Sequence, residues 1–378
     1  MKRTWSQVNR RIEKGEVVVL TAEEMTAFAA ERGVKEASRK VDVVTTGTFA
    51  PMCSSGLLIN TGHSSPRINY SRAWINGVPA YAGIAAVDLY IGATSRSEFE
   101  AGNRMYGGGH VIQELVSGKK VRLKAEGHGT DCYPGRFLER ELELKDLGDA
   151  ILMNPRNCYQ NYNVAVNASS DRTIHTYMGP LLPGMRNAAF SSAGQLSPLL
   201  NDPCYRTVGI GSRVFLGGGV GYVTFRGTQH NPHVERTTGD LPAEGAGTLA
   251  LTGDLRGMSP RYLRGVSIKK YGVSLAVGVG IAIPVLDEEM AVYTSVSDED
   301  ITAPVVDYGS DYPGLSGRII GRTNYRALRS GAIRLNGSEV RTVPYSSYTM
   351  AREIANELRE RIMRKEFRLT EPAAPLKD

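Results

Sequence analysis

The chain has 378 residues, of which 41% are apolar, and it carries a formal net charge of +6 with a pI near 9.0. A chain of this length buries most of the surface that its unfolded form exposes. We therefore expect one catalytic domain over residues 1–370, or two closely packed subdomains in its place, followed by a frayed tail over 371–378. Lys and Arg are scattered rather than gathered in a basic stripe, which argues against nucleic-acid binding and suits small anionic ligands.

The sequence predicts a cytoplasmic protein without a membrane span. Its first residues, MKRTWSQVNRRIEKGE, lack the apolar core of a signal peptide. No stretch approaches the ~20 apolar residues that cross a bilayer. In a reducing compartment the cysteines are expected to be free thiols, catalytic groups or metal ligands rather than disulfides.

The N-terminal segment predicts alternating helices and strands. Val8 and Ile12 are spaced for a short helix, and residues 17–20 for a strand. Thr21 and Glu24 form a capping box that opens a second helix. Met25 and Phe28 are expected to face inward from this helix, and Gly33 lies where it could end the helix.

The middle of the chain is β-rich and glycine-rich. Residues 42–49 predict one strand, and residues 220–225 and 273–279 are further β-type runs. The chain has 42 glycines, about a ninth of its residues, against a usual share of about 7%. Many short strands joined by tight turns explain part of this excess, and close approach of backbone to a ligand would explain more.

The C-terminal segment predicts a long helix over residues 347–367. Ile354, Leu358 and Ile362 are spaced for one inward face. Two outward i,i+4 ion pairs are expected, Glu357–Arg361 and Glu360–Arg364. The predicted fold class is therefore α/β, with mixed helices and strands, many glycines and a long C-terminal helix.

The four cysteines are Cys53, Cys132, Cys158 and Cys204. They form no C-x-x-C pair and no zinc-finger spacing with histidine, so neither a metal site nor an intrinsic iron–sulfur cluster is expected. A lone cysteine is usually an inert small hydrophobe. Cys158 and Cys204 have no nearby His or Lys, and we interpret both as structural.

Cys53 and Cys132 lie in more reactive surroundings. Cys53 follows a predicted strand in the turn Pro-Met-Cys-Ser-Ser-Gly, whose backbone N–H groups could stabilise a thiolate. Cys132 lies in the polar loop Glu-Gly-His-Gly-Thr-Asp-Cys-Tyr-Pro-Gly. Within that loop, His128 and Asp131 are candidates for proton transfer. We therefore take Cys53 and Cys132 as the candidate catalytic residues.

Two further motifs favour a nucleotide or a ligand only weakly. The run Gly209-Ile-Gly-Ser-Arg-Val-Phe-Leu-Gly-Gly-Gly-Val-Gly221 lacks the third glycine of a dinucleotide fingerprint, and β-type residues follow where a helix is required. His230 and His233 lie three residues apart. They could contact a ligand, but an ordinary loop explains them more simply.

Several motifs together resemble one family, the L-aspartate semialdehyde sulfurtransferases of homocysteine biosynthesis. The resemblance runs from about residue 5 to 365. It rests on VDVVTTGTFAPMCSSG at 41–56, GHS at 62–64, GHGTDC at 127–132, YMGPLLP at 177–183, LSPLLNDP at 196–203, GIG at 209–211, FLGGGVG at 215–221 and GTQH at 227–230. Longer family members carry C-terminal CBS domains. This chain stops after its helix, so regulation by adenine nucleotides through such domains is not expected.

The resemblance implies that L-aspartate semialdehyde, sulfide or another sulfur donor, and two electrons give L-homocysteine. It also implies two functional cysteines, which map onto Cys53 and Cys132, with Cys132 as the carrier of a persulfide. No cofactor is expected within the chain. The family works with a small iron–sulfur, ferredoxin-like partner, from which the electrons would come. A homo-oligomer is left open.

Our mechanistic hypothesis is that Cys132 carries the transferred sulfur and Cys53 resolves the intermediate, or the reverse. We therefore expect the two thiols to face one pocket. The substrate carboxylate calls for an Arg or a nest of backbone N–H groups. The candidate contacts with the substrate are Arg136, Gly217, Gly218, Gly219, Gly221 and His230. Two alternatives belong to other classes: a nicotinamide-dependent oxidoreductase and a non-catalytic persulfide carrier.

Overall fold

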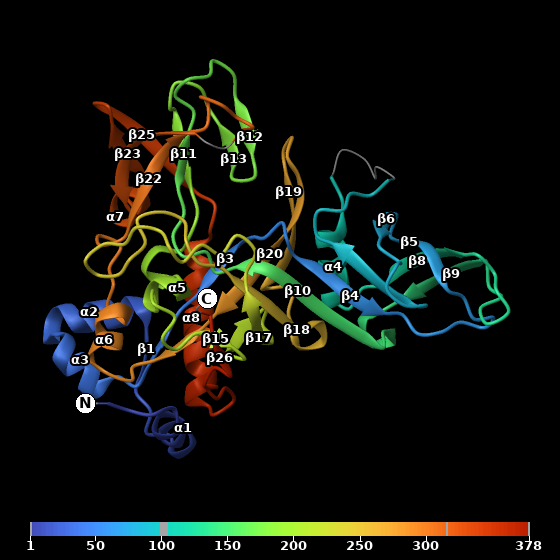
Figure 1. The fold of residues 1–378 in the computed structure, drawn as a ribbon, viewed down its shortest axis with the longest axis horizontal. Coiled ribbons are helices and arrows are strands. Elements are labelled where there is room, and N and C mark those ends of the chain that lie inside the picture. Colours follow the sequence, from blue (N-terminus) through green and yellow to red (C-terminus); the bar gives the residue numbers. More distant parts are fainter. Residues whose placement is uncertain (1, 99–104, 315–316, 377–378) are drawn as a thin grey trace.

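The computed structural model describes residues 2–98, 105–314 and 317–376. Figure 1 shows a central sheet beside the helix α8 (Tyr348–Met363), a second sheet above it and an arm that projects to one side. Helices and strands both contribute substantially, so the predicted mixed α/β class with a long C-terminal helix is confirmed. No helix in the described ranges is long and apolar enough to cross a membrane.

The central sheet has nine antiparallel strands in the order β19-β20-β16-β17-β18-β10-β4-β7, and β3 also pairs with β20. Every residue of β20 is buried, as expected for a central strand made almost wholly of apolar residues and glycine. The predicted β-type runs 220–225 and 273–279 are confirmed as β17 and β20. The strands are β3 (Thr48–Pro51), β4 (Gly56–Asn60), β7 (Asp88–Gly92), β10 (Asp149–Asn157), β16 (Arg213–Leu216), β17 (Gly219–Arg226), β18 (Leu249–Asp254), β19 (Leu263–Ile268) and β20 (Gly272–Gly280).

The arm is a four-stranded antiparallel sheet in the order β6-β5-β8-β9. Buried and exposed residues alternate along most of β8, as expected for a strand with one face on a core. Ile75 and Leu123 of the arm belong to the same apolar cluster as Leu57 and Leu152 of the central sheet, so one core joins the two parts. Its elements are β5 (Tyr70–Ile75), β6 (Val78–Ala80), α4 (Gly108–Val116), β8 (Val121–Gly127) and β9 (Phe137–Leu142).

The upper sheet has six strands in the order β23-β22-β11-β14-β25-β24 and a core of its own. Its pairing is mixed, because β11 runs parallel to β22 and β14 runs parallel to β25. The elements of this part, including a small hairpin and a short helix, are β11 (Val164–Val166), β12 (Ile174–Thr176), β13 (Gly179–Leu181), β14 (Asn187–Phe190), β22 (Thr302–Asp307), β23 (Arg318–Asn324), α7 (Tyr325–Arg329), β24 (Ala332–Leu335) and β25 (Ser338–Pro344).

The N-terminal prediction of alternating elements is confirmed. Val8 and Ile12 are buried in the first helix. Thr21 caps the second helix with the predicted capping box, and Gly33 follows its last residue. The elements of this part are α1 (Trp5–Lys14), β1 (Val19–Thr21), α2 (Ala22–Arg32), α3 (Val34–Lys40), β2 (Val43–Thr45), α5 (Pro198–Asn201), β21 (Ala282–Pro284) and α6 (Glu288–Thr294).

The single strand predicted over residues 42–49 is wrong. The segment forms β2 and then β3, in two different sheets, with a break between Thr45 and Thr48. Gly47 lies in this break against α8, where a Cβ would overlap the carbonyl oxygen of Ala351. Glycine therefore allows the chain to pass close under the helix and enter the central sheet just before Cys53.

The helix α8 begins after Ser347 as predicted but ends at Met363 rather than Phe367. Lys365 has a φ of 65°, a left-handed conformation that ends the helical run. The predicted inward residues Ile354, Leu358 and Ile362 are buried.

One of the two predicted ion pairs on α8 forms. Arg361 lies 2.8 Å from Glu357, as expected. The predicted Glu360–Arg364 pair is wrong, because Arg364 is the C-cap residue and pairs instead with Glu366 at 3.1 Å.

The predicted frayed tail is also wrong over its described residues. The short strand β26 (Ala374–Pro375) pairs with β15 (Gly209–Ile210), and Leu376 is buried. The apolar Leu376 therefore anchors a segment whose two prolines indicated a loose end. Residues 377–378 lie outside the described part of the chain.

Candidate functional site

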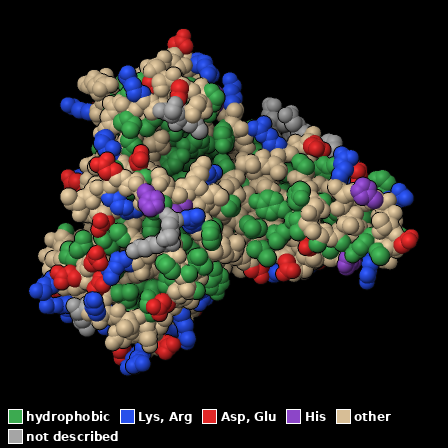
Figure 2. Space-filling view, in the orientation of Figure 1, with side chains coloured by type: hydrophobic (Ala, Val, Ile, Leu, Met, Phe, Trp, Pro, Cys, Tyr) green, Lys and Arg blue, Asp and Glu red, His purple; other side chains and the backbone are tan. Residues whose placement is uncertain are grey.

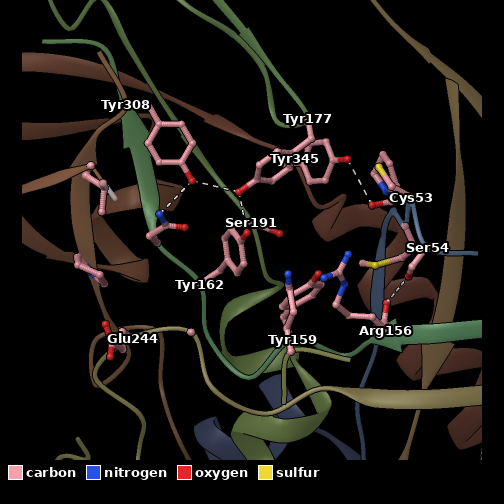
Figure 3. Close-up of a pocket in the computed structure, with 18 of the residues that line it drawn as sticks. Cys53, Ser54, Arg156, Tyr159, Tyr162, Tyr177, Ser191, Glu244, Tyr308 and Tyr345 are labelled. Carbon is pink, nitrogen blue, oxygen red and sulfur yellow. Dashed lines mark hydrogen bonds between the residues drawn. The ribbon is translucent and has the colours of Figure 1, made fainter. Parts of the chain in front are cut away.

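A cavity of about 560 Å³ lies between the central and upper sheets (Figure 3). Strand ends and connections from both sheets meet there, since β3, β10 and β20 approach it from one side and β22 and β25 from the other. We call this cavity the Cys53 pocket. The described residues that line it are Pro51, Met52, Cys53, Ser54, Arg156, Tyr159, Tyr162, Asn163, Tyr177, Ser191, Gln229, Glu244, Gly245, Tyr271, Pro304, Val306, Tyr308, Gly317, Ile319 and Tyr345.

Cys53 is held where β3 leaves the sheet. The N–H of Met52 donates to the carbonyl of Leu275 at 2.7 Å, so the sheet pairing fixes the residue before the thiol. The Cys53 sulfur lies 3.6 Å from the hydroxyl of Tyr271 and 3.6 Å from that of Ser274. The sequence predicted backbone N–H groups around this sulfur, whereas the printed contacts are side-chain hydroxyls from the neighbouring strand β20 and the turn before it.

Six tyrosines surround the cavity. The hydroxyls of Tyr162 and Tyr177 are 2.6 Å apart, and that of Tyr177 is 3.1 Å from that of Tyr308. Burial raises the pKa of Tyr271 and Tyr177, and it raises the pKa of Tyr159 to about 12. These phenols therefore keep their protons at neutral pH and can donate hydrogen bonds to a substrate.

Arg156 supplies positive charge to the pocket. It lies at the end of β10 and is the one Lys or Arg among the described lining residues. Figure 3 shows it beside Ser54, whose hydroxyl donates to the Arg156 carbonyl at 3.4 Å. Within the described ranges, no carboxylate pairs with its guanidinium. A half-buried, unpaired guanidinium is suited to bind an anionic group of a substrate.

Cys132 lies outside the Cys53 pocket. It is exposed in the β8–β9 connection, residues 128–136, at the outer end of the arm (Figure 1). The neighbouring candidates His128, Asp131 and Arg136 are exposed on the same loop and line no part of the pocket. The expectation that both thiols face one pocket is therefore wrong within a single chain, because the arm sheet holds this loop away from the centre.

The predicted glycine nest is a β-turn instead. Gly217 and Gly218 have φ values of 59° and 97° and join β16 to β17 as a two-residue hairpin. Gly219 and Gly221 continue into β17, where no helix follows, so the segment is neither a dinucleotide fingerprint nor a lining of the pocket. The turn packs against Met258, Tyr262 and Leu263.

His230 also lies outside the pocket, although the preceding Gln229 lines it. The Nδ1 of His230 accepts a hydrogen bond from the Thr248 N–H at 3.1 Å, and its ring lies 5.4 Å from that of Tyr205. These contacts hold a loop in place, which agrees with the interpretation of His230 as part of an ordinary loop rather than as a ligand contact.

The remaining cysteines are held in apolar or hydrogen-bonded surroundings. Cys158 is 3% exposed, and burial raises the pKa of its thiol, which suppresses the thiolate. Cys204 receives a hydrogen bond from the Tyr293 hydroxyl at 3.6 Å and lines no part of the pocket. Over the described ranges, no group of three or more His, Cys, Asp or Glu is arranged to hold a metal ion.

The family model described as "Homocysteine biosynthesis enzyme, sulfur-incorporation" matches residues 17–369, nearly the whole chain and the Cys53 pocket with it. The chain belongs to this family. A relative from Methanocaldococcus jannaschii, named L-aspartate semialdehyde sulfurtransferase, is 48% identical over 98% of this chain and 72% of its own. A relative of the same name from Methanosarcina acetivorans is 47% identical over 98% of this chain and 71% of its own.

A more distant relative, an uncharacterized protein from Methanothermobacter thermautotrophicus, is 29% identical over 87% of this chain and 72% of its own. No solved structure matches the chain.

Sequence reasoning missed Arg156 and the tyrosines of this family member. One signal was available, because the chain has 18 Tyr but only 8 Phe. Phe packs in a core as well as Tyr does, so an excess of Tyr indicates that the hydroxyl groups form hydrogen bonds or contact a ligand. The pocket collects six of them from segments that are far apart in sequence.

Proposed function

We propose that the chain forms L-homocysteine from L-aspartate semialdehyde and sulfide, and that the reaction takes place in the Cys53 pocket. The relatives' names supply the substrate, and the family description supplies the product and the incorporation of sulfur. The observation that carries the proposal is the Cys53 thiol held against the Tyr271 hydroxyl in a pocket that also contains Arg156.

The reaction needs both sulfur and electrons. The aldehyde, hydrogen sulfide, two electrons and two protons give one thiol and one water. Sulfide converts the carbonyl carbon to a thiocarbonyl with loss of water, and the two electrons reduce that group to the thiol. Two cysteines can carry the sulfur through a disulfide and a persulfide, while an external donor supplies the electron pair.

We assign Cys53 and Cys132 to a persulfide cycle. Sulfide attacks their disulfide, which leaves a persulfide on Cys132 and a thiol on Cys53. The persulfide, the thiol, the aldehyde, two electrons from the donor and two protons then give homocysteine, water and the disulfide again. Each turnover thus consumes one sulfide and one external electron pair.

Tyr271 is assigned as the proton donor to the substrate oxygen. Addition of a sulfur nucleophile to an aldehyde places negative charge on that oxygen, and a neighbouring O–H stabilises and protonates it. Tyr271 is placed for this role because its hydroxyl, which keeps its proton at neutral pH, lies 3.6 Å from the Cys53 sulfur.

Arg156 is assigned to the α-carboxylate of the substrate. This replaces the sequence-based candidate Arg136, which is exposed on the arm. An Arg–carboxylate pair is charge-assisted and often bidentate, which fixes orientation as well as affinity. The tyrosine rings around the cavity offer π faces to the substrate ammonium group.

The electrons are proposed to come from a separate iron–sulfur, ferredoxin-like protein, without a cofactor resident in this chain. A basic hollow beside the Cys53 pocket supports docking of an acidic donor: it is lined by Arg172, Lys269 and Lys270. It adjoins the pocket because Lys270 directly precedes Tyr271. Opposite charges on two proteins steer their encounter.

Anaerobic incubation with sulfide, L-aspartate semialdehyde and a reductant, assayed for homocysteine, tests the proposal. Wild type and Cys204→Ser should form homocysteine, and Cys53→Ser should not. A persulfide that forms without turnover of the semialdehyde would favour a sulfur carrier instead. Strict dependence on NADH would favour an oxidoreductase, which the hairpin at Gly217 and Gly218 already argues against. A fully active Cys53→Ser protein would refute the site.

A further inference from the structure

We propose that the active site is completed between two copies of this chain: the 128–136 loop of one copy brings its Cys132 to the mouth of the Cys53 pocket of another. The inference rests on the proposed function, because a two-thiol cycle requires the two sulfurs to meet.

Within one chain the two thiols lie in different parts of the fold. Cys53 follows β3 at the centre of the molecule, whereas Cys132 lies at the outer end of the arm (Figure 1). A disulfide requires Cα atoms within about 7 Å of each other. No residue of the 128–136 loop lines the Cys53 pocket, even though the lining includes segments from both sheets.

Backbone hydrogen bonds hold the 128–136 loop in its position at the end of the arm. The Gly127 N–H donates to the Arg136 carbonyl at 2.9 Å, and the Gly135 N–H donates to the Arg67 carbonyl at 2.8 Å. Inside the loop, Thr130 and Tyr133 exchange backbone hydrogen bonds of 2.8 and 3.1 Å. A fold-back of the loop alone would break this hairpin.

Packing against the central sheet also prevents the whole arm from rotating toward the pocket. Its sheet packs into the same apolar cluster as the central sheet, with Leu123 and Ile75 on one side and Leu57 and Leu152 on the other. Rotating the arm would expose these side chains to water, and the loss of their burial opposes that rotation.

The other two cysteines cannot replace Cys132. Cys158 is the nearest in sequence to the pocket lining, but it is 3% exposed and burial suppresses its thiolate. Cys204 is engaged by the Tyr293 hydroxyl and lines no part of the pocket. Cys132 is exposed and accessible to a second molecule.

The pocket has room for a loop tip as well as the substrate. Cavities of about 300–1,000 Å³ hold drug-sized ligands, and a four-carbon amino-acid aldehyde is much smaller than those, so it would not fill 560 Å³. Apolar side chains are exposed on both proposed partners: Ile319 lines the pocket and is 55% exposed, and Phe137 beside the Cys132 loop is 77% exposed. Figure 2 shows the arm standing out from the body, free to reach another molecule.

A two-fold axis would make the exchange reciprocal. Each copy would give its arm to the other, so a dimer would hold two complete sites, each with one Cys53 and one Cys132. The chemical step is unchanged: sulfide opens the disulfide to a persulfide on Cys132 and a thiol on Cys53, and these two groups, the aldehyde, two electrons from the external donor and two protons then give homocysteine, water and the disulfide.

Complementation between inactive variants tests the proposal. Cys53→Ser and Cys132→Ser are prepared separately, then co-expressed with different tags and purified through both. A mixed dimer has one intact site of two, so it should show about half of the wild-type activity. A double variant carrying both substitutions, paired with wild type through the same tags, is the control. It should be inactive if the sites lie between chains, because each site then lacks one thiol, whereas it should keep about half of the activity if each site lies within one chain.

Inactive Cys53→Ser/Cys132→Ser mixed dimers, with an active wild type, would overturn the shared site while leaving the proposed function intact. A wild type that forms no homocysteine would instead refute the proposed function itself. A fully active Cys132→Ser variant would remove the need for the loop and also overturn the inference.

Disulfide mapping provides a second readout that does not depend on activity. Ordinary and heavy-nitrogen chains are expressed separately, mixed in equal amounts, co-refolded, oxidised under native conditions and digested. Linked Cys53 and Cys132 peptides of mixed isotope content are expected. Linked peptides of like isotope content alone would place the bond within one chain, and absence of any Cys53–Cys132 link would also contradict the proposal.

Discussion

At the scale of single residues, the Cys53 pocket combines a thiol, a phenol and a guanidinium that no local motif connects. Cys53 was found from its turn of small residues, because the chemistry of a thiol is visible in its neighbours. Tyr271 and Arg156 were not, since each lies in an unremarkable stretch and lines the cavity only because the turn before β20 and the end of β10 meet there. Arg136 lies close to Cys132 in sequence, but that closeness says nothing about the pocket.

Tyr271→Phe should lower kcat by about 100-fold while the protein folds normally, because general-acid catalysis contributes about 10²–10⁴-fold. KM for the semialdehyde should change little, since the ring remains. Homocysteine formation under saturating substrate measures this loss. Tyr222→Phe, which removes the hydroxyl of an exposed tyrosine on β17, is the matched control and should keep full activity. An unchanged kcat in Tyr271→Phe would assign the proton to another group.

Arg156→Ala should raise KM for the semialdehyde by about 10–100-fold, the equivalent of the ~1.5–3 kcal/mol of a hydrogen bond to a charged group. Arg156→Lys should recover part of the loss, because it restores the charge without the planar fork. Arg334→Ala, on the exposed side of β24, is the control for removing an arginine. If Arg156→Ala and Arg334→Ala behave alike in steady-state kinetics, the carboxylate binds elsewhere.

At the scale of elements, the sequence predicted those helices and strands that depend on interactions between residues close together along the chain. The capping box at Thr21, the inward face of α8 and the strand β20 follow from hydrogen bonding and periodicity within a few residues. The failures have long-range causes. The strand predicted at 42–49 is split because the chain passes close under α8 at Gly47. The tail is ordered because β26 pairs with β15.

A helix cap offers a test at this scale. Asp287 caps α6, with its side chain accepting from the Met290 N–H, and two hydrogen bonds of 2.8 and 2.7 Å from Arg206 lower the pKa of Asp287 from 3.8 to about 2. A carboxyl with a lowered pKa contributes stability that is fully present above 3.8 and is lost as pH falls through about 2.

Asp287→Ala should therefore lower the free energy of unfolding by about 1–2 kcal/mol at neutral pH. The difference from wild type should stay constant down to about pH 5 and shrink toward pH 2. Urea unfolding at several pH values measures it, with Asp149→Ala, an exposed strand residue, as the control. A difference that does not shrink across this range would show that the ion pair contributes nothing to the cap.

At the scale of the whole molecule, the sequence indicated the fold class and the family but not the layout. Which strands share a sheet depends on contacts hundreds of residues apart, such as β3 with β20 or β14 with β25. For the same reason the sequence could not show that Cys53 lies at the centre and Cys132 at the end of the arm.

The basic hollow beside the pocket gives a prediction about electron delivery. The double variant Lys269→Glu, Lys270→Glu should raise KM for an acidic ferredoxin-like donor at least 10-fold at low salt, because rim charges act mainly on association. Activity with a small chemical reductant should stay unchanged. Lys14→Glu, at the far end of α1, is the control. Equal dependence on salt in wild type and variant would place donor docking on another surface.

The central claim, that the Cys53 pocket binds the substrate, is tested most directly by thiol labelling read at all four cysteines. A small alkylating reagent is applied with and without L-aspartate semialdehyde, and each cysteine peptide is quantified by mass spectrometry. The substrate should protect Cys53, and this protection should be lost in Arg156→Ala. Cys158 should stay unlabelled until the protein unfolds, as expected for a thiol that is 3% exposed. Unchanged labelling of Cys53 at saturating substrate would contradict the account.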